Sequence, residues 1–227
     1  MEPGQDSVDA AAPDDAGRLV RRILVIAIAA VVLGFAIQLL MLAAKLSFGL
    51  PFTATGFILD VTQGVTWSLL VCTGVGLITS IAKARFLLAG LLAAIAAPLS
   101  IAIAKGAQKA MAGALSAAEQ QAVLSLSTIS ILKSLEYAAL GWLLARLVQR
   151  GEGQALPYLA RGLAIGVVFG GAISALTHQV ALGRGIDPGM GRLAASLINE
   201  VLFPIGCATV IYVGQLAARS VKAASGA

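Results

Sequence analysis

The sequence contains few charged residues, and this scarcity excludes most soluble folds. Asp, Glu, Lys and Arg together make up 12% of the 227 residues, whereas 59% of the residues are hydrophobic and the mean hydropathy is +0.92. A soluble domain covers its surface with roughly a quarter charged residues. This chain cannot do so, and we therefore expect lipid to be its main solvent and no soluble enzyme domain of useful size.

Histidine and cysteine are also scarce, which excludes several kinds of site. A single histidine, His178, cannot provide bis-histidine haem ligation or an HExxH zinc site. The two cysteines, Cys72 and Cys207, lie inside apolar runs without metal-ligand spacing, and we interpret them as buried small side chains. The sequence has neither a GxxxxGK[ST] phosphate loop nor a GxSxG nucleophile elbow. We therefore expect no metal site and no cofactor, and nothing in the sequence supports an enzyme.

The first 17 residues carry acidic side chains and no basic one. The acidic residues are Glu2, Asp6, Asp9, Asp14 and Asp15. With Gly, Pro and Ala between them, this composition is typical of a disordered segment. We therefore predict a disordered acidic cytoplasmic tail over 1–17, a transmembrane domain over 18–222 and a short C-terminal tail over 223–227. The basic residues lie at helix ends rather than in a patch with aromatic residues, so we expect no nucleic-acid partner.

Six apolar runs approach or exceed the length of about 20 residues that a membrane-spanning helix needs. They cover 23–45, 56–82, 86–104, 121–145, 162–183 and 193–217. The predicted fold class is therefore all-α, a polytopic membrane protein with six transmembrane helices. Residues 105–120 are expected to form an amphipathic connection. Basic residues recur at similar intervals along the chain, which indicates an arrangement as three pseudo-repeated helical hairpins.

The distribution of basic residues predicts the orientation in the membrane, because cytoplasmic loops carry an excess of Lys and Arg. An N-terminus in the cytoplasm places these residues inside: Arg18, Arg21, Arg22, Lys83, Arg85, Arg146, Arg150, Arg161, Arg219 and Lys222. It places fewer outside, namely Lys45, Lys105, Lys109, Arg184 and Arg192. We therefore expect a multi-pass protein of a bacterial inner membrane, with both termini in the cytoplasm.

Small residues at a spacing of four follow one face of the second and one face of the fifth predicted helix. The stripe on the second helix includes Gly64, Ser68 and Gly76, and the stripe on the fifth includes Gly162, Gly166 and Gly170. Lipid supplies no hydrophobic force between helices, so small residues that let backbones approach hold membrane helices together. We expect these faces to pack against other helices, either within the chain or in another subunit.

Two ionisable residues lie three apart near the middle of the fourth predicted helix. A charge at the centre of a span costs about 2.5–3.5 kcal/mol on insertion scales. Lys133 and Glu136 are close enough for an ion pair on one helix, and a purely structural pair is one interpretation. The other is a polar cavity open to water, lined by Asp60, Lys133, His178, Asn199 and Glu200.

Glu200 is the strongest single candidate among these residues. No basic residue lies three or four positions away on its own helix, and Pro204 lacks the N–H that would bond the Glu200 carbonyl. A buried carboxylate without a partner can take up and release a proton. For His178 alone, a packed or interfacial histidine is the simpler interpretation.

These features lead to two hypotheses of function. The first is a transporter or channel component for an ion or small solute, with a polar intramembrane site on the fourth and sixth helices. The alternative is a non-catalytic accessory or structural subunit of a larger membrane complex, docked through its glycine stripes. The expected partners are the lipid bilayer and either other membrane proteins or further copies of this chain.

Overall fold

The computed structural model describes residues 12–81, 86–118 and 122–224, which form helices joined by short connections and contain no strand. The helices are α1 (Ala12–Ser47), α2 (Ala54–Ile81), α3 (Phe86–Ala114), α4 (Leu126–Gln149), α5 (Ala155–Ile165), η1 (Gly166–Gly170), α6 (Gly171–Gly183) and α7 (Gly189–Ala224). The π-helical turn η1 joins α5 and α6 into one rod over Ala155–Gly183. The predicted all-α polytopic membrane fold is confirmed.

Five of the described helices are long and apolar enough to cross a membrane. These spans are Leu19–Ser47, Ala54–Ser80, Phe86–Ala114, Ala155–Gly183 and Gly189–Arg219. The sixth predicted span, in α4, is not among them, although α4 packs inside the bundle beside α3. Its 24 residues include Lys133, Glu136 and several hydroxyl side chains, which lower its hydropathy. The structure thus confirms a helix here, but its composition alone does not mark it as a span.

Some helix boundaries differ from the predicted ones. Helix α1 begins at Ala12, so residues 12–17 of the predicted disordered tail are helical, whereas residues 1–11 lie outside the described part. Pro13 suits the first turn of a helix, because the N–H that proline lacks would have no partner within the helix there. Helix α3 continues to Ala114, so the predicted connection over 105–120 was wrong for most of its length.

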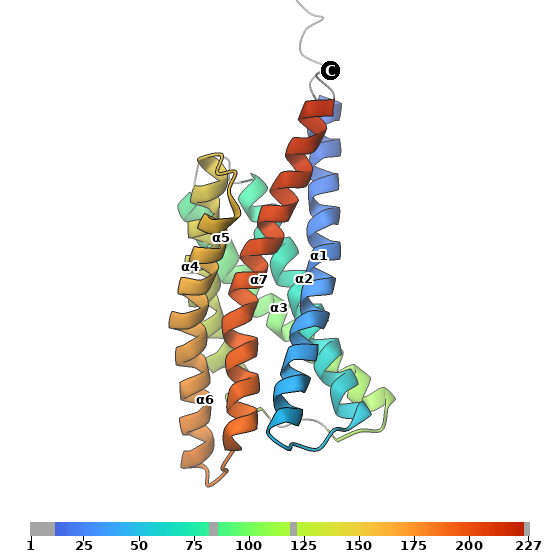
Figure 1. Cartoon of the computed structure of the whole chain (residues 1–227), viewed down its shortest axis with the longest axis vertical. Coiled ribbons are helices and arrows are strands. Elements are labelled where there is room, and N and C mark those ends of the chain that lie inside the picture. The colour runs from blue at the N-terminus through green and yellow to red at the C-terminus, as the bar shows by residue number, and fades with distance from the viewer. Residues whose placement is uncertain (1–11, 82–85, 119–121, 225–227) are drawn as a thin grey trace, which may run out of the picture.

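The helices lie side by side along the long axis of the molecule (Figure 1). Helix α1 packs between α2 and α7, α2 contacts α3, α3 contacts α4, and the α5–α6 rod packs on α7. Helices α2, α4 and α7 also contact one another across the bundle. Polar side chains on the facing sides of these three helices can therefore meet at its centre.

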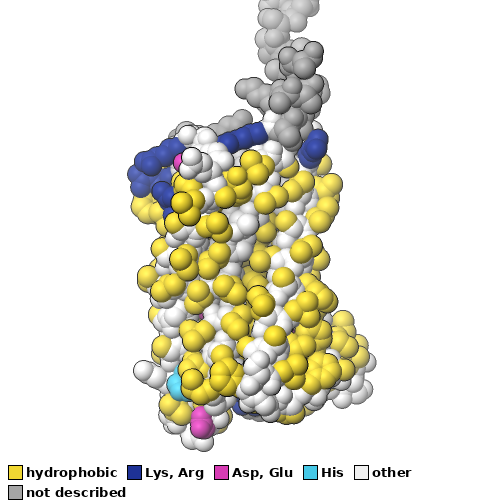
Figure 2. Space-filling model, in the orientation of Figure 1, with side chains coloured by type: hydrophobic (Ala, Val, Ile, Leu, Met, Phe, Trp, Pro, Cys, Tyr) yellow, Lys and Arg dark blue, Asp and Glu magenta, His cyan; other side chains and the backbone are white. Residues whose placement is uncertain are grey.

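The two ends of the bundle differ in charge. At one end, called the basic end, α1 begins, α7 ends and the α4–α5 turn lies (Figure 1). Lys and Arg side chains gather there in the space-filling view (Figure 2). The opposite end, called the pocket end, carries the α1–α2, α3–α4 and α6–α7 connections.

Helices of the same chain cover both small-residue stripes. A Cβ on Gly76 would lie 2.7 Å from Ile26 Cδ1 of α1, and the Ser68 hydroxyl donates to the Ala30 carbonyl of α1 at 2.7 Å. A Cβ on Gly64 would meet the side chain of Gln38, also on α1. The stripes therefore hold this chain together and no longer point to docking of a partner chain.

The stripe on the α5–α6 rod packs directly against the backbone of α7. A Cβ on Gly162 would lie 2.7 Å from Ile205 Cα, and a Cβ on Gly166 would overlap the Val201 carbonyl. A Cβ on Gly170 would lie 2.6 Å from the carbonyl carbon of Glu200. These close approaches hold the stretch of α7 that carries Glu200.

Candidate functional site

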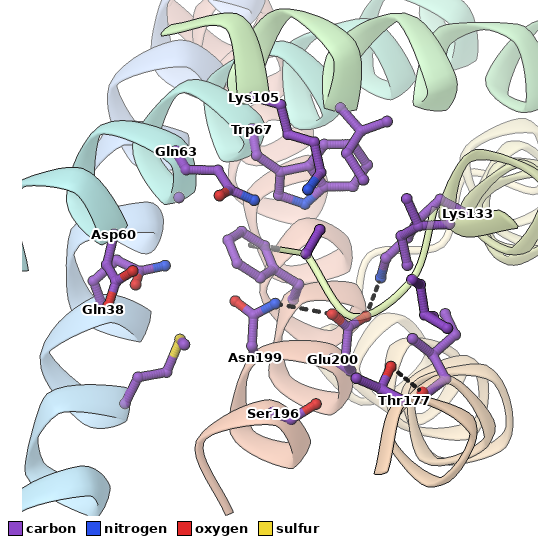
Figure 3. Close-up of a pocket in the computed structure, with 18 residues that line it drawn as sticks. Gln38, Asp60, Gln63, Trp67, Lys105, Lys133, Thr177, Ser196, Asn199 and Glu200 are labelled. Carbon is purple, nitrogen blue, oxygen red and sulfur yellow. Dashed lines mark hydrogen bonds and ion pairs between the residues drawn. The ribbon is translucent and has the colours of Figure 1, made fainter. Parts of the chain in front are cut away.

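The centre of the bundle holds a charged triad that consists of Lys133, Glu136 and Glu200. The ammonium of Lys133 lies 2.8 Å from Oε2 of Glu136 on the same helix. It also lies 2.5 Å from Oε2 of Glu200 on α7 (Figure 3). Lys133 is 4% exposed and Glu136 is 0% exposed. One ammonium thus serves two carboxylates, and the triad carries one negative charge in excess when both are ionised.

Aromatic rings enclose the ammonium of Lys133. Its Nζ lies 5.9 Å from the ring centroid of Trp67 on α2 and 5.8 Å from that of Tyr137 on α4. The two rings meet edge to face with centroids 5.4 Å apart. Contact with ring faces favours a cation, and Lys133 is 4% exposed. The low dielectric of such an enclosure makes any imbalance of charge costly.

Asn199 and the local structure of α7 position Glu200. The side-chain amide of Asn199 donates to Oε1 of Glu200 at 3.1 Å (Figure 3). One helical turn later, Pro204 has no N–H for the Glu200 carbonyl, and this carbonyl lies against Gly170 of η1. A π-helical turn carries an extra residue and locally widens the helix. Glu200 therefore stands where α7 and the α5–α6 rod both depart from regular α-helical geometry.

A pocket of about 240 Å³ lies on the pocket-end side of the triad. Helices α1, α2, α3, α4, α6 and α7 contribute to its lining, together with Ala122 and Leu124 of the α3–α4 connection. Lys133 and Glu200 are part of its wall, and Ala122 is exposed to solvent. The polar lining residues are Gln38, Asp60, Gln63, Lys105, Lys133, Thr177, Ser196, Asn199 and Glu200 (Figure 3). A small solute that entered from the pocket end would thus meet the triad directly.

The remaining carboxylate in the wall of the pocket, Asp60, has its own cation. Oδ2 of Asp60 lies 2.7 Å from Nζ of Lys45, on the last turn of α1. Asp60 and Gln38 also border a second cavity of about 120 Å³ beneath the α1–α2 connection. The charge of Asp60 is thus balanced independently of the triad.

The structure brings together most, but not all, of the residues predicted to share a cavity. The pocket is lined by Asp60, Lys133, Asn199 and Glu200. Glu136 does not line the pocket but forms an ion pair with Lys133. His178 does not line it; the Nδ1 atom of this residue is buried and makes no hydrogen bond within the described part of the chain. The reason is helical phase, because α6 turns Ile173 and Thr177 toward the pocket instead.

The expectation that Glu200 has no charged partner was wrong. The prediction considered only neighbours on the same helix, and the partner is Lys133 of α4. The interpretation of Lys133 and Glu136 as a self-contained pair is also incomplete, since Lys133 holds both carboxylates.

Several lining residues were not predicted from the sequence, among them Gln38, Lys105 and Trp67. Gln38 is the only polar side chain between Arg22 and Lys45, and such isolation in an apolar run was a usable signal. Lys105 was assigned to a connection, although α3 continues through it. Nothing in the local sequence indicates that Trp67 packs on Lys133, because this contact depends on how α2 and α4 cross.

Within the described residues, no group of three or more His, Cys, Asp or Glu side chains is arranged to hold a metal ion. Comparison of the chain with known protein families, with curated proteins and with solved structures found no match. The triad and the pocket are therefore the features of this chain that bear on its function.

Proposed function

We propose that this chain is a membrane transport protein for a small solute and that Glu200 exchanges a proton at the inner wall of the pocket. The observation that carries the proposal is the imbalance of the triad, in which two carboxylates share one ammonium beside a cavity. A buried excess charge is costly, so uptake of a proton or of a compensating charge from the pocket would be favourable. A purely structural ion pair has no need of a second carboxylate or of an adjoining cavity.

The basic-end half of the bundle supports the same proposal, because it is densely packed. Cys72, Val75, Leu144 and Ile211 are fully buried there, and they belong to the main hydrophobic core. A route from the pocket to the basic end is therefore closed in this conformation. This is the arrangement expected of a carrier that admits its solute from one side at a time.

We further propose that the basic end faces the cytoplasm of a bacterial cell and that the pocket opens outward. The basic end carries Arg21, Arg22, Arg146, Arg150 and Arg219, and basic residues favour the cytoplasmic side. The α3–α4 connection, whose residue Ala122 borders the pocket, then lies outside.

Thiol labelling tests both the pocket and its orientation. The native Cys72 and Cys207 are buried, so an introduced cysteine should dominate the reaction. We expect Ser196→Cys, in the pocket wall, to react with a membrane-impermeant maleimide in intact cells. Ser100→Cys is the matched control, because Ser100 is buried on α3 and does not line the pocket. Equal labelling of both variants, or labelling of Ser196→Cys only in inverted vesicles, contradicts the proposal.

Protonation of Glu200 should be visible in the fluorescence of Trp67. The chain has two tryptophans, so a Trp142→Phe background leaves Trp67, which contacts Lys133, as the single reporter. We expect its emission to change with pH in one titration step, because protonation of Glu200 removes a negative charge beside Lys133. The step should vanish in Glu200→Gln and persist in Asp60→Asn, whose carboxylate has Lys45 instead. A titration that Glu200→Gln leaves unchanged would refute the proton exchange.

A further inference from the structure

The pocket wall contains a second ammonium, that of Lys105, which has no counter-charge among the described residues. Lys105 lies on α3, is half-buried and borders the pocket. In Figure 3 its side chain reaches from α3 toward the indole ring of Trp67, across the pocket from Glu200. Among the described residues, no hydrogen bond or ion pair is made by its ammonium. A cation without a partner in a partly enclosed pocket is a place where an anion binds.

The charges around the pocket limit what can bind there. The groups of the wall and their ion partners are Lys45, Lys105, Lys133, Asp60, Glu136 and Glu200. Among the described residues these positive and negative charges are equal in number, so they sum to zero before a solute binds. A bare anion would leave the site with an excess negative charge, whereas an anion that arrives with a proton would not.

We propose that the pocket binds a small monocarboxylate anion together with one proton, the anion on the ammonium of Lys105 and the proton on the carboxylate of Glu200. The inference builds on the proposed transport function and names its substrate class. The proton comes from the aqueous phase and forms an O–H bond on Glu200, which leaves the ion pair with Lys133. Lys133 keeps Glu136 as its counter-ion, and the carboxylate of the solute becomes the counter-ion of Lys105.

A zwitterion would also leave the site neutral, but the structure favours it less. Its ammonium would need Glu200, and the oxygens of Glu200 already face Lys133 at 2.5 Å and the amide of Asn199 at 3.1 Å. A neutral solute would leave Lys105 without a counter-charge. The apolar part of the lining suits the short alkyl part of a carboxylate, and it includes Met41, Ile101, Ile129, Ile173 and Phe203.

The expected dependence on pH takes account of the charged and titratable groups that face Glu200 among the described residues. They are Lys133, Glu136 and Tyr137 from α4, Lys105 from α3 and Asp60 from α2. The lining residues from α1 and α6 are uncharged, namely Gln38, Met41, Ile173 and Thr177. Since Glu200 is the group that takes up a proton in the proposed step, acid conditions should strengthen binding of the anion through Glu200.

The test compares four solutes with the same three-carbon skeleton by calorimetric titration of the purified full-length protein. The solutes are propionate, alanine, propylamine and propionamide, which differ in charge. We expect propionate to bind most tightly, to bind better at acidic pH, and to take up one proton per anion. Proton uptake is measured from the heat of binding in buffers of different ionisation enthalpy.

Two variants test whether the anion binds at Lys105 and the proton at Glu200. Lys105→Gln should weaken propionate binding by about tenfold or more, since a hydrogen bond between charged groups is lost. Lys109→Gln is the matched control, because Lys109 is exposed on the same helix and does not line the pocket. Glu200→Gln imitates the protonated carboxyl, so it should bind propionate without proton uptake and without dependence on pH.

Each contrary result has a distinct meaning. Tighter binding of alanine, propylamine or propionamide overturns the substrate class while leaving a solute pocket in place. Unchanged binding in Lys105→Gln overturns the role of Lys105. If none of the four solutes binds, the substrate class fails; if the pocket thiol of Ser196→Cys is also inaccessible, the transport function fails with it.

Discussion

Replacement of Lys133 by methionine is expected to lower the free energy of unfolding by about 3–5 kcal/mol, the range for removal of one partner from a buried ion pair. Methionine resembles the alkyl part of lysine, so the loss is mainly one of charge. Glu136, which is 0% exposed, and Glu200 would then face each other without a cation. Unfolding titrations in mixed micelles, followed by circular dichroism, measure the change.

The same substitution at Lys105 is the control. Lys105 is half-buried in the wall of the same pocket and makes no ion pair within the described residues, so Lys105→Met should change stability little. The triple variant Lys133→Met, Glu136→Gln, Glu200→Gln should recover most of the loss, because replacing a whole buried ion cluster with neutral groups is often neutral or stabilising. Equal stability of Lys133→Met and Lys105→Met would show that the triad is not desolvated.

Substitution of either carboxylate of the triad should change the stability of the protein less than substitution of Lys133. Glu200→Gln leaves Lys133 and Glu136 as a neutral pair, and Glu136→Gln leaves Lys133 with Glu200. Neither variant leaves a buried charge without a counter-ion, and each removes the excess negative charge. Each is therefore expected to have a free energy of unfolding close to that of the wild type. This asymmetry between one lysine and two glutamates separates an imbalanced triad from a structural ion pair, in which loss of either partner is equally harmful.

The part of the site that could be predicted was the part governed by helical periodicity. Lys133 and Glu136 lie three residues apart, and any α-helix brings such residues to one face. The pairing of Lys133 with Glu200 joins α4 to α7, which are distant in the sequence, and its cause is how these helices cross. No local pattern encodes that crossing, and for this reason Glu200 was expected to stand alone.

The error in α3 has a different physical cause. Hydropathy measures how well a segment suits lipid, and it falls in the stretch of the sequence that contains Lys105 and Lys109. Helix propensity depends on the backbone and on side-chain entropy, and it stays high through an alanine-rich stretch up to Ala114. The end of the apolar run therefore did not mark the end of the helix, and Lys105 was placed in a loop rather than on the pocket wall.

A second large effect is expected where the α5–α6 rod meets α7. Gly170→Leu should prevent the two helices from packing, because even a Cβ at this position would lie 2.6 Å from the Glu200 carbonyl carbon. The contact is with backbone, which cannot rotate away as a side chain can, so α7 must shift as a whole. Since that stretch of α7 carries Glu200, the ion pair with Lys133 should be lost as well. We expect a large loss of folded protein on size-exclusion chromatography and no pH step in Trp67 emission.

Adjacent glycines provide a control that differs only in what the new methyl group meets. Gly170→Ala is expected to destabilise the protein by about 1–3 kcal/mol, as overpacking of a close contact does. Gly171→Ala, where a Cβ meets nothing within 4 Å, should be neutral or stabilising by about 0.5–1 kcal/mol, because alanine favours the helix over glycine. Opposite signs at consecutive positions of one rod would show that the glycine at 170 is required for the approach to Glu200 rather than for flexibility. If both alanine variants behaved alike, Glu200 would be positioned by α4 and Asn199 alone, and the close packing of η1 on α7 would have no part in holding the site.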